Sequence, residues 1–232
     1  MVNKYEITKI IEQVAPPESA EPWDLSGWIV ETGRTNIEKV MLCLTVTEDI
    51  LNQAKQSGSD MIISHHPLFV VPLDFNRGID IYCAHTNLDK AECGTTETLI
   101  KVLGFGNAQS YGHEFLRFCD CEMSFEELLE RLKRISNNIR YTNQKGLKSA
   151  KRIAFCGGSG TDFWHDTMEL GADVLVTGDL KFHTALDSKI SIIDIGHFES
   201  EILVINELAR LLANRIEILQ AKESSPIIQT NS

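Results

Sequence analysis

The side chains best suited to chemistry in this sequence are two adjacent histidines, His65 and His66, which follow the apolar run Met61-Ile62-Ile63. Successive side chains on extended backbone point in opposite directions, so the pair suits two metal ions better than one. Imidazole nitrogen is a ligand for Zn, Mn, Fe, Ni and Co, whereas Ca²⁺ prefers oxygen. A His-His pair taken alone is equally compatible with a structural role.

Two further histidines are each followed four residues later by an acid, in the pairs His85 with Asp89 and His197 with Glu201. Positions i and i+4 share one face of a helix, so His197 and Glu201 can bind one ion together. A carboxylate could also bridge two ions roughly 3.5–4 Å apart, and such a pair generates hydroxide from bound water near neutral pH. The structural alternative is that an acid in the first helical turn stabilises the helix dipole.

The remaining sequence alternates buried-looking strands with amphipathic helices, which predicts the α/β class. We predict strands at 40–44, 60–63, 79–84, 151–156, 172–176 and 190–195, and helices at 1–14, 48–56, 95–103, 124–135, 163–170 and 199–219. In open α/β folds, ligand sites form beyond the carboxyl ends of the strands. His65, His66, His85 and His197 all lie at such ends.

Two stretches of the chain resemble one another in the same order. Residues 57–64 align with 170–177, and residues 79–85 align with 190–197 with one insertion. We therefore predict an internal duplication that produces two similar, intertwined α/β halves, with a metal site in the cleft between them. The halves are residues 1–104 and 151–232, joined by a connecting segment, residues 105–150, without a large insert.

The sequence alone does not assign a single role to the glycine-rich segment at 157–160 or to the polar residues that follow the strand at 172–176. Gly157-Gly158-Ser159-Gly160 precedes a predicted helix and is either a phosphate-binding turn or a tight turn without a ligand. Thr177-Gly178-Asp179 and His183 occupy the place of the His-His pair in the second half, and are candidates for supporting or substrate-binding roles. We interpret Trp23 and Trp28 as packing residues.

Composition limits the class of protein. The net charge of -11 over 232 residues argues against a nucleic-acid-binding surface. No apolar run approaches the roughly 18 residues that a membrane span requires, and the amino terminus lacks the apolar region of a signal peptide. The six cysteines form no C-x-x-C pair, so we interpret them mainly as core residues of a cytoplasmic protein.

These motifs resemble the Nif-three-like (NGG-interacting-factor) family, whose members are also labelled GTP cyclohydrolase I type 2 homologues or YbgI-like proteins. The resemblance rests on Ser64-His65-His66-Pro67-Leu68, Ala84-His85-Thr86-Asn87-Leu88-Asp89, Thr177-Gly178-Asp179 and Gly196-His197 with Glu201. The chain departs from the family at Leu44-Thr45-Val46-Thr47, where the family reads Leu-Asp-Val-Thr. The resemblance implies a toroidal homohexamer and a dinuclear centre with His65, His66, Asp89, His197 and Glu201 as metal ligands, Glu201 bridging.

The resulting prediction is a protein that binds two divalent transition-metal ions per chain (Zn, Fe, Mn, Ni or Co). We expect it to hydrolyse a small, nucleotide-like molecule through metal-bound hydroxide, with no separate protein nucleophile. The alternative is a non-catalytic metal-binding assembly, a metallochaperone or an adaptor. An open coordination position favours the enzyme, and saturated ligation favours the structural role.

Overall fold

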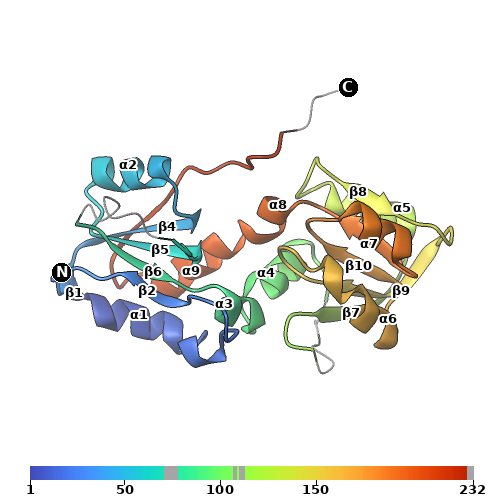
Figure 1. Cartoon of the computed structure of the whole chain (residues 1–232), viewed down its shortest axis with the longest axis horizontal. Coiled ribbons are helices and arrows are strands. Elements are labelled where there is room, and N and C mark those ends of the chain that lie inside the picture. Colours follow the sequence, from blue (N-terminus) through green and yellow to red (C-terminus); the bar gives the residue numbers. More distant parts are fainter. Residues whose placement is uncertain (71–77, 107–108, 110–112, 229–232) are drawn as a thin grey trace. The chain divides into compact units, whose positions relative to one another are not determined.

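The computed structural model describes residues 1–70, 78–106, 109 and 113–228. The chain divides into two compact units (Figure 1). Unit 1 comprises Met1–Gly94 and Val204–Ser224, whereas unit 2 comprises Thr95–Leu203 and the chain from Ser225 onward. Both units are mixed α/β structures, which confirms the predicted fold class.

Unit 1 is built on a five-stranded sheet with the order β12-β4-β5-β6-β2. Its strands are β2 (Gly27–Val30), β4 (Lys39–Thr45), β5 (Met61–His66), β6 (Asp80–Cys83) and β12 (Glu217–Gln220). Strands β12, β4, β5 and β6 are parallel, and β2 pairs antiparallel with β6 at one edge. A separate antiparallel pair joins β1 (Val2–Asn3) to β3 (Asn36–Ile37). The carboxyl ends of β5 and β6 therefore lie side by side.

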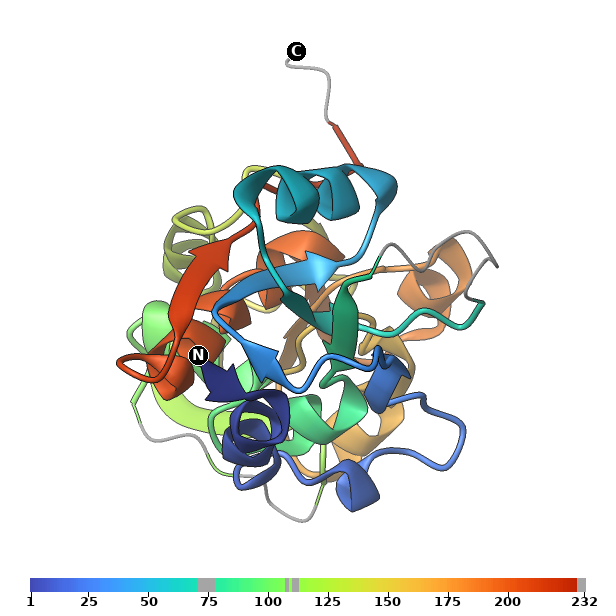
Figure 2. The ribbon, with the colours of Figure 1, turned by 90° about the vertical axis from the view of Figure 1, so that its left-hand side faces the viewer.

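Helices cover both faces of this sheet. They are α1 (Lys4–Glu12), the 3-10 turn η1 (Pro17–Ser19), α2 (Glu48–Ser57), α3 (Thr86–Lys90) and α9 (Val204–Leu212). Helices α1 and α2 lie on opposite faces (Figures 1 and 2). Helix α2 begins at Thr47, whose hydroxyl accepts from the Ile50 amide, and ends at Gly58 with φ of 69°. Its Ile50 and Leu51 are buried, and each stabilises the fold by about 1.5–3 kcal/mol.

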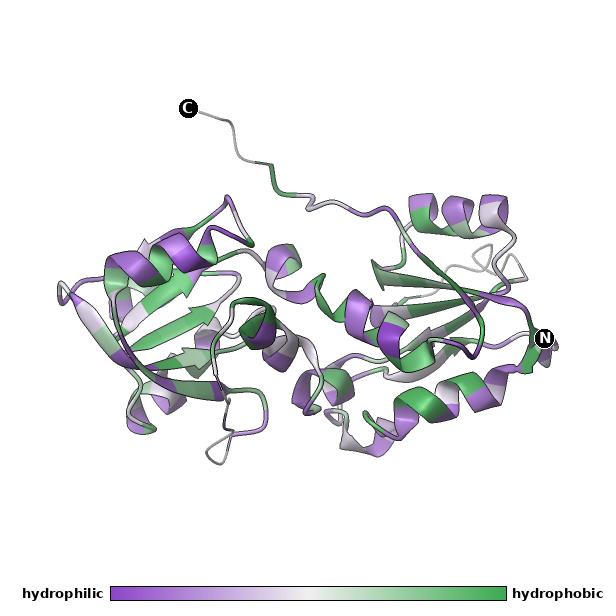
Figure 3. Cartoon of the chain, turned by 180° about the vertical axis from the view of Figure 1, so that it is seen from behind, coloured by the Kyte–Doolittle hydropathy of each residue, from purple (hydrophilic) through white to green (hydrophobic). Residues whose placement is uncertain are grey.

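Unit 2 is built on a second five-stranded sheet, with the order β7-β9-β10-β11-β8. Its strands are β7 (Arg117–Ser124), β8 (Arg140–Thr142), β9 (Ser149–Phe155), β10 (Val174–Thr177) and β11 (Ser191–Asp194). The helical elements are α4 (Thr95–Val102), α5 (Phe125–Leu132), η2 (Thr161–Phe163), α6 (Trp164–Glu169), α7 (Phe182–Asp187) and α8 (His197–Glu201). Strands β9, β10 and β11 are parallel, and both edge strands are antiparallel. The strands of both sheets are largely hydrophobic (Figure 3), as expected for sheets buried on two faces.

The two sheets share a common plan. Each sheet contains three consecutive parallel strands, of which the first two are joined through helix α2 or α6. An antiparallel strand that precedes these three in the chain closes one edge. Strands β2, β4, β5 and β6 thus correspond to β8, β9, β10 and β11. This correspondence supports the predicted duplication, which stays an inference from matching order and direction.

The correspondence extends to single hydrogen bonds. The Asp60 Oδ2 atom accepts from the Glu38 and Lys39 amides at 2.7 and 3.3 Å. In unit 2 the Asp173 Oδ2 atom accepts from two amides within β9, those of Lys151 and Arg152, at 2.7 and 3.2 Å. The side chains of Lys39 and Arg152 then donate to the last carbonyls of the following helix region, Ser57 and Leu170, at 3.0 and 3.1 Å. Each aspartate immediately precedes one core strand and holds two backbone amides of, or next to, the neighbouring strand.

Two local predictions were wrong. The single helix predicted over 199–219 is instead α8, α9 and strand β12, because Asn214 adopts a left-handed φ of 64° and ends the helical run. Residues 105–150 are more than a connection, since they supply β7, α5 and β8 to unit 2. The predicted core role of Cys43, Cys83 and Cys156 is confirmed by their burial. No helix among the described residues is both long and apolar enough to span a bilayer.

Candidate metal-binding site

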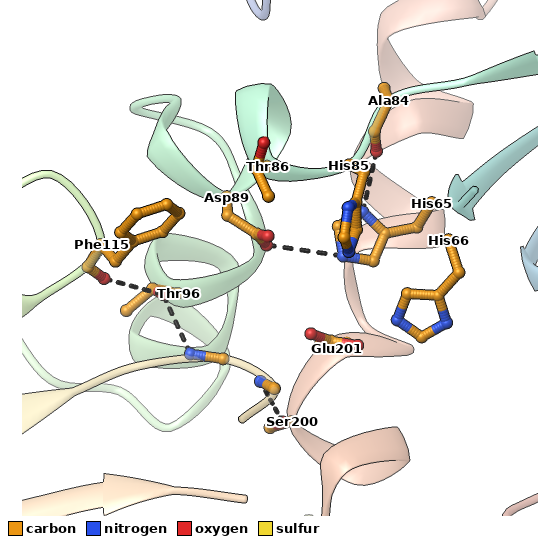
Figure 4. A network of polar contacts seen from close by, with 12 residues as sticks. His65, His66, Ala84, His85, Thr86, Asp89, Thr96, Phe115, Ser200 and Glu201 are labelled. Atoms are coloured by element: carbon orange, nitrogen blue, oxygen red, sulfur yellow. Dashed lines mark hydrogen bonds and ion pairs between the residues drawn. The ribbon is translucent and has the colours of Figure 1, made fainter. Parts of the chain in front are cut away.

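His65 lies at the carboxyl end of β5 and is fully buried. Its Nδ1 atom is 2.8 Å from the Ala84 carbonyl oxygen (Figure 4), and because a carbonyl can only accept, Nδ1 carries the hydrogen. Its Nε2 atom lies 3.4 Å from the Asp89 Oδ1 atom. When His65 is neutral, Nε2 presents a lone pair toward a carboxylate. A cation between the two atoms would satisfy both.

His66 is held by the neighbouring strand. Thr45 and His66 are register partners on β4 and β5, and the Thr45 hydroxyl is 2.6 Å from His66 Nδ1. The position of Thr45 is fixed in turn by its backbone amide, which donates to the Glu223 carboxylate at 3.1 Å. Thr45 therefore supports His66 with a neutral hydroxyl. This contact leaves His66 able to coordinate through Nε2.

His85 is held by Asp24, a residue that the sequence analysis did not single out. The His85 Nδ1 atom donates to Asp24 Oδ1 at 2.8 Å, and the Asp24 side chain is fully buried. Burial opposes ionisation of Asp24, but hydrogen bonds from Thr86, His85 and Ser26 outweigh it and lower the pKa of Asp24 to about 2. The sequence signal for this role is the run Asp24-Leu25-Ser26, in which Asp24 also accepts from the Leu25 amide at 2.7 Å.

The three histidines of unit 1 converge. One ring nitrogen of each of His65, His66 and His85 lies within 4.8 Å of the others. The ring centroids are 5.0 Å apart for His65 and His66, 5.4 Å for His65 and His85, and 5.7 Å for His66 and His85. Asp89, on helix α3, faces the same group through His65. Unit 1 thus gathers three imidazoles and a carboxylate at the ends of two parallel strands.

Unit 2 places His197 and Glu201 on one face of helix α8, as their spacing predicts. The His197 Nε2 atom is 3.0 Å from Glu201 Oε2, and Nδ1 is 2.6 Å from Asp179 Oδ2. The hydrogen bond to Glu201 raises the pKa of His197 against the opposing effect of burial, and with the contribution of Asp179 the pKa reaches about 10. His197 therefore lies between two carboxylates. Its Nδ1 atom contacts Asp179, and its Nε2 atom points toward Glu201.

The glycine-rich turn after β9 shapes the surroundings of Glu201. Gly158 has a φ of +64°, and a Cβ atom added there would lie 2.1 Å from Glu201 Oε1. Gly158 also donates its amide to the Ser200 hydroxyl at 2.9 Å, next to Glu201 on α8 (Figure 4). The amides of Gly157 and Gly160 donate to the hydroxyls of Thr96 and Thr177. All three amides donate to protein hydroxyls, which argues against the phosphate-binding alternative. The turn instead provides the space that the Glu201 carboxylate occupies.

The other candidates lie elsewhere. His183 is exposed on α7. Trp28 packs between Tyr5 and Tyr82, with ring centroids 5.9 and 5.3 Å away, as predicted. Trp23 is 61% exposed and lies outside the core, contrary to the packing role predicted for it. Its ring lies 6.3 Å from that of His85 in an edge-on arrangement.

The donor atoms of both units are those that divalent transition metals prefer, namely imidazole nitrogens and carboxylate oxygens. Each of the four histidines has its Nδ1 held by a carbonyl, hydroxyl or carboxylate oxygen, the usual support for a metal-binding imidazole. The side chains therefore fit a metal. The fold and these residues define an α/β protein with a candidate site for transition-metal ions.

The chain belongs to the Duf34/NIF3 (NGG1p interacting factor 3) family, whose model matches residues 2–230. A relative from Clostridium perfringens, "GTP cyclohydrolase 1 type 2 homolog", is 32% identical, with 94% of this chain and 96% of that protein covered. A relative of the same name from Campylobacter jejuni is 34% identical, with 90% and 91% covered.

Solved structures show the same fold. The Bacillus cereus protein related to NIF3 has a TM-score of 0.84 at 18% identity, with 99% of each chain covered. Reduced HcgD from Methanocaldococcus jannaschii has a TM-score of 0.82 at 24% identity, with 94% of this chain and 97% of that chain covered.

Proposed function

We propose that this protein binds two divalent transition-metal ions per chain, with His65, His66, Asp89, His197 and Glu201 as ligands and Glu201 bridging. The observation that carries the proposal is the approach of the fully buried His65 to Asp89 at 3.4 Å, with Nδ1 already committed to the Ala84 carbonyl. This arrangement directs one nitrogen and one carboxylate oxygen at a shared point, where a cation would offset their repulsion.

The contribution of unit 2 rests on its own geometry. His197 and Glu201 form an i, i+4 pair whose donor atoms approach to 3.0 Å, and Asp179 fixes the imidazole from behind. Glu201 is almost fully buried, although a carboxylate avoids burial unless a cation or hydrogen-bond donors compensate it. A bridging role would give both of its oxygens a positive partner.

We further propose that the centre catalyses hydrolysis of a small, nucleotide-like molecule. A pair of metal ions supplies hydroxide near neutral pH and stabilises the attacking and leaving oxygens. The chain's own residues would orient the ligands and hold Glu201 away from bulk water. The nucleotide-like substrate is suggested by the two relatives, which bear the name of a GTP cyclohydrolase.

A hydrolase screen tests this proposal. Purified protein loaded with Mn²⁺, Co²⁺, Zn²⁺, Ni²⁺ or Fe²⁺ would be assayed with nucleotides and related phosphate and amide compounds. The blank is Glu201→Ala. The matched control is Glu199→Ala on the same helix, whose side chain accepts from Asn138 at 3.3 Å and is not a proposed ligand. We expect activity in the wild type and in Glu199→Ala, and none in Glu201→Ala.

Equal activity in the Glu201→Ala protein would reject the catalytic proposal. Metal binding without any hydrolysis would favour the alternative, a non-catalytic metal-binding assembly, metallochaperone or adaptor. The coordination of the bound metal distinguishes the enzyme from the non-catalytic protein. An exchangeable water ligand favours an enzyme, and a site saturated by protein ligands favours a structural ion.

We also propose a homohexamer in the cytoplasm, as the family resemblance implies. Burial raises the pKa of the Cys43 and Cys83 thiols, which makes them inert core residues of the kind common in reducing compartments. Light scattering after gel filtration should give about six times the mass of the 26.0 kDa chain. A monomer at micromolar concentration would contradict the hexamer.

A further inference from the structure

We propose that Trp23 is a stacking platform for the flat ring of a purine-like ligand, beside the candidate metal site of unit 1. The proposal rests on the proposed function and deepens it, because it names the part of the nucleotide-like molecule that the chain recognises and the residue that recognises it. Trp23 binds no metal in this account. Its role is to hold the base next to the metal-binding histidines.

The exposure of Trp23 is the first argument. Trp23 is 61% exposed, although tryptophan has a large apolar surface and is highly buried on average in folded proteins. The ring of His85 lies 6.3 Å away at an interplanar angle of 77°. A single imidazole in this edge-on arrangement cannot cover both faces of an indole, so a broad aromatic surface remains open to solvent.

The position of Trp23 relative to the candidate metal ligands is the second argument. The His85 ring that Trp23 contacts has its centroid 5.4 Å from that of His65 and 5.7 Å from that of His66. Trp23 therefore lies one imidazole ring away from two proposed metal ligands. Because a purine is about the size of an indole ring, a base stacked on Trp23 would lie next to these histidines.

The rigidity of the turn that carries Trp23 is the third argument. The Asp24 amide donates to the Glu21 carbonyl at 2.9 Å and closes a β-turn with Pro22 at its second position. Both ends of the turn are bound to Thr86, since the Glu21 amide donates to its hydroxyl at 2.9 Å, and the Asp24 carboxylate accepts from its amide and hydroxyl at 3.1 and 2.6 Å. A rigidly held aromatic ring binds a flat ligand with little loss of conformational entropy.

The charges around the turn indicate which part of a nucleotide would bind here. Glu21 is paired with Lys90 at 2.7 Å, and Asp24 is paired with His85 at 2.8 Å. Lys90 is the one Lys or Arg of this turn and of helix α3, both of which lie within the described residues. This edge of the site therefore has no surplus positive charge for a phosphate, and the group that it recognises is the uncharged base.

Calorimetric titration of full-length, Mn²⁺-loaded protein with GMP tests the inference. We expect Trp23→Leu to weaken GMP binding at least about tenfold, as is typical when an aromatic ring is removed from a stacked base. Trp23→Phe keeps an aromatic face and should stay within about threefold of the wild type. The control is Phe182→Leu, which removes a 75% exposed aromatic ring from α7 and should leave GMP affinity unchanged. Ribose 5-phosphate has no base, so Trp23→Leu should not alter its affinity.

Tryptophan emission gives a second readout. A base stacked on Trp23 should quench part of the emission of the wild-type protein. In Trp23→Phe the quenching should disappear although GMP still binds, because Trp28 packs between Tyr5 and Tyr82 and Trp164 is buried. Circular dichroism and metal content of each variant should match the wild type, since Trp23 is neither a core residue nor a proposed ligand.

Three results would overturn the inference. They are equal GMP affinity in Trp23→Leu and the wild type, quenching that persists in Trp23→Phe, and a wild-type protein with two bound ions that does not bind GMP. Failure of the proposed function is a different result, namely fewer than two ions in the wild-type protein.

Discussion

At the scale of single residues, Glu201 depends on the absence of a side chain opposite it. Gly158 provides this space and does so in a left-handed conformation, with φ of +64°. Gly146 has nearly the same φ, +63°, but a Cβ atom there would meet nothing within 4 Å. Substitutions at these two glycines can therefore distinguish the effect of backbone strain, which both share, from the effect of displacing Glu201, which only Gly158 has.

We predict that Gly158→Ala and Gly146→Ala each lose about 1–2 kcal/mol of unfolding free energy through left-handed strain. Only Gly158→Ala should also lose metal affinity, at least tenfold, because its methyl group would push Glu201 aside. Urea unfolding and Co²⁺ titration measure the two effects. Equal metal affinity in both variants would show that Gly158 does not seat a ligand.

Asp179 offers a second test at this scale. It has a φ of 58°, which glycine and asparagine tolerate, and its carboxylate accepts from His197 Nδ1. We predict that Asp179→Gly, which removes the acceptor without strain, lowers metal affinity about 10–100-fold. Asp179→Asn, which retains an acceptor oxygen, should stay within a few-fold of the wild type. A similar loss in both variants would point to charge instead of orientation.

Residue types and spacing predicted which side chains are candidate ligands, but not what holds them. The supports of His85, His66, His65 and His197 lie 61, 21, 19 and 18 residues away in the chain. Such contacts arise from strand pairing and loop packing, which leave no local pattern in the sequence. Asp179 was a candidate only because it follows a strand in the second half. Asp24 was missed, because its only signal is the short local run Asp24-Leu25-Ser26.

At the scale of elements, Asp60 accepts from two amides at the start of β4, and Asp173 accepts from two amides within β9. A hydrogen bond to a charged group contributes about 1.5–3 kcal/mol. Each aspartate makes one short bond of 2.7 Å, and its second bond, at 3.3 or 3.2 Å, is long and adds little. Equivalent positions in a duplicated frame should therefore contribute comparable stability.

We predict that Asp60→Ala and Asp173→Ala each lower the free energy of unfolding by about 1.5–3 kcal/mol. The control is Asp162→Ala, whose side chain is 75% exposed and which should change stability by less than about 0.5 kcal/mol. Urea denaturation of the three variants measures this. A large effect at one position and none at the other would argue against equivalent roles.

Strands and helices with strong apolar patterns were predictable, whereas those at the edges were not. Edge strand β7 alternates between faces, with Cys119, Cys121 and Met123 packed on one core, so it never forms a continuous apolar run. Strand β12 follows directly on a helix, and the turn between them uses Asn214 instead of glycine or proline. Its partner is β4, far away in sequence, so only tertiary pairing defines it.

At the scale of the whole molecule, each sequence half supplies elements to the other unit. Helix α4 follows the elements of the first sheet but belongs to unit 2, and α9 with β12 follows the second sheet but belongs to unit 1. This exchange is the sense in which the predicted halves are intertwined. Its extent could not be read from local sequence, because the choice of unit depends on long-range packing.

The central claim is that ligands from both units bind two metal ions in each chain. Elemental analysis of protein purified without added chelator measures it directly. We predict about two transition-metal ions per chain in the wild type and in His183→Ala, whose histidine is exposed on α7. His66→Ala combined with Glu201→Ala should lower the content to one ion or fewer. A metal-free native protein, or full occupancy in that double variant, would contradict the account.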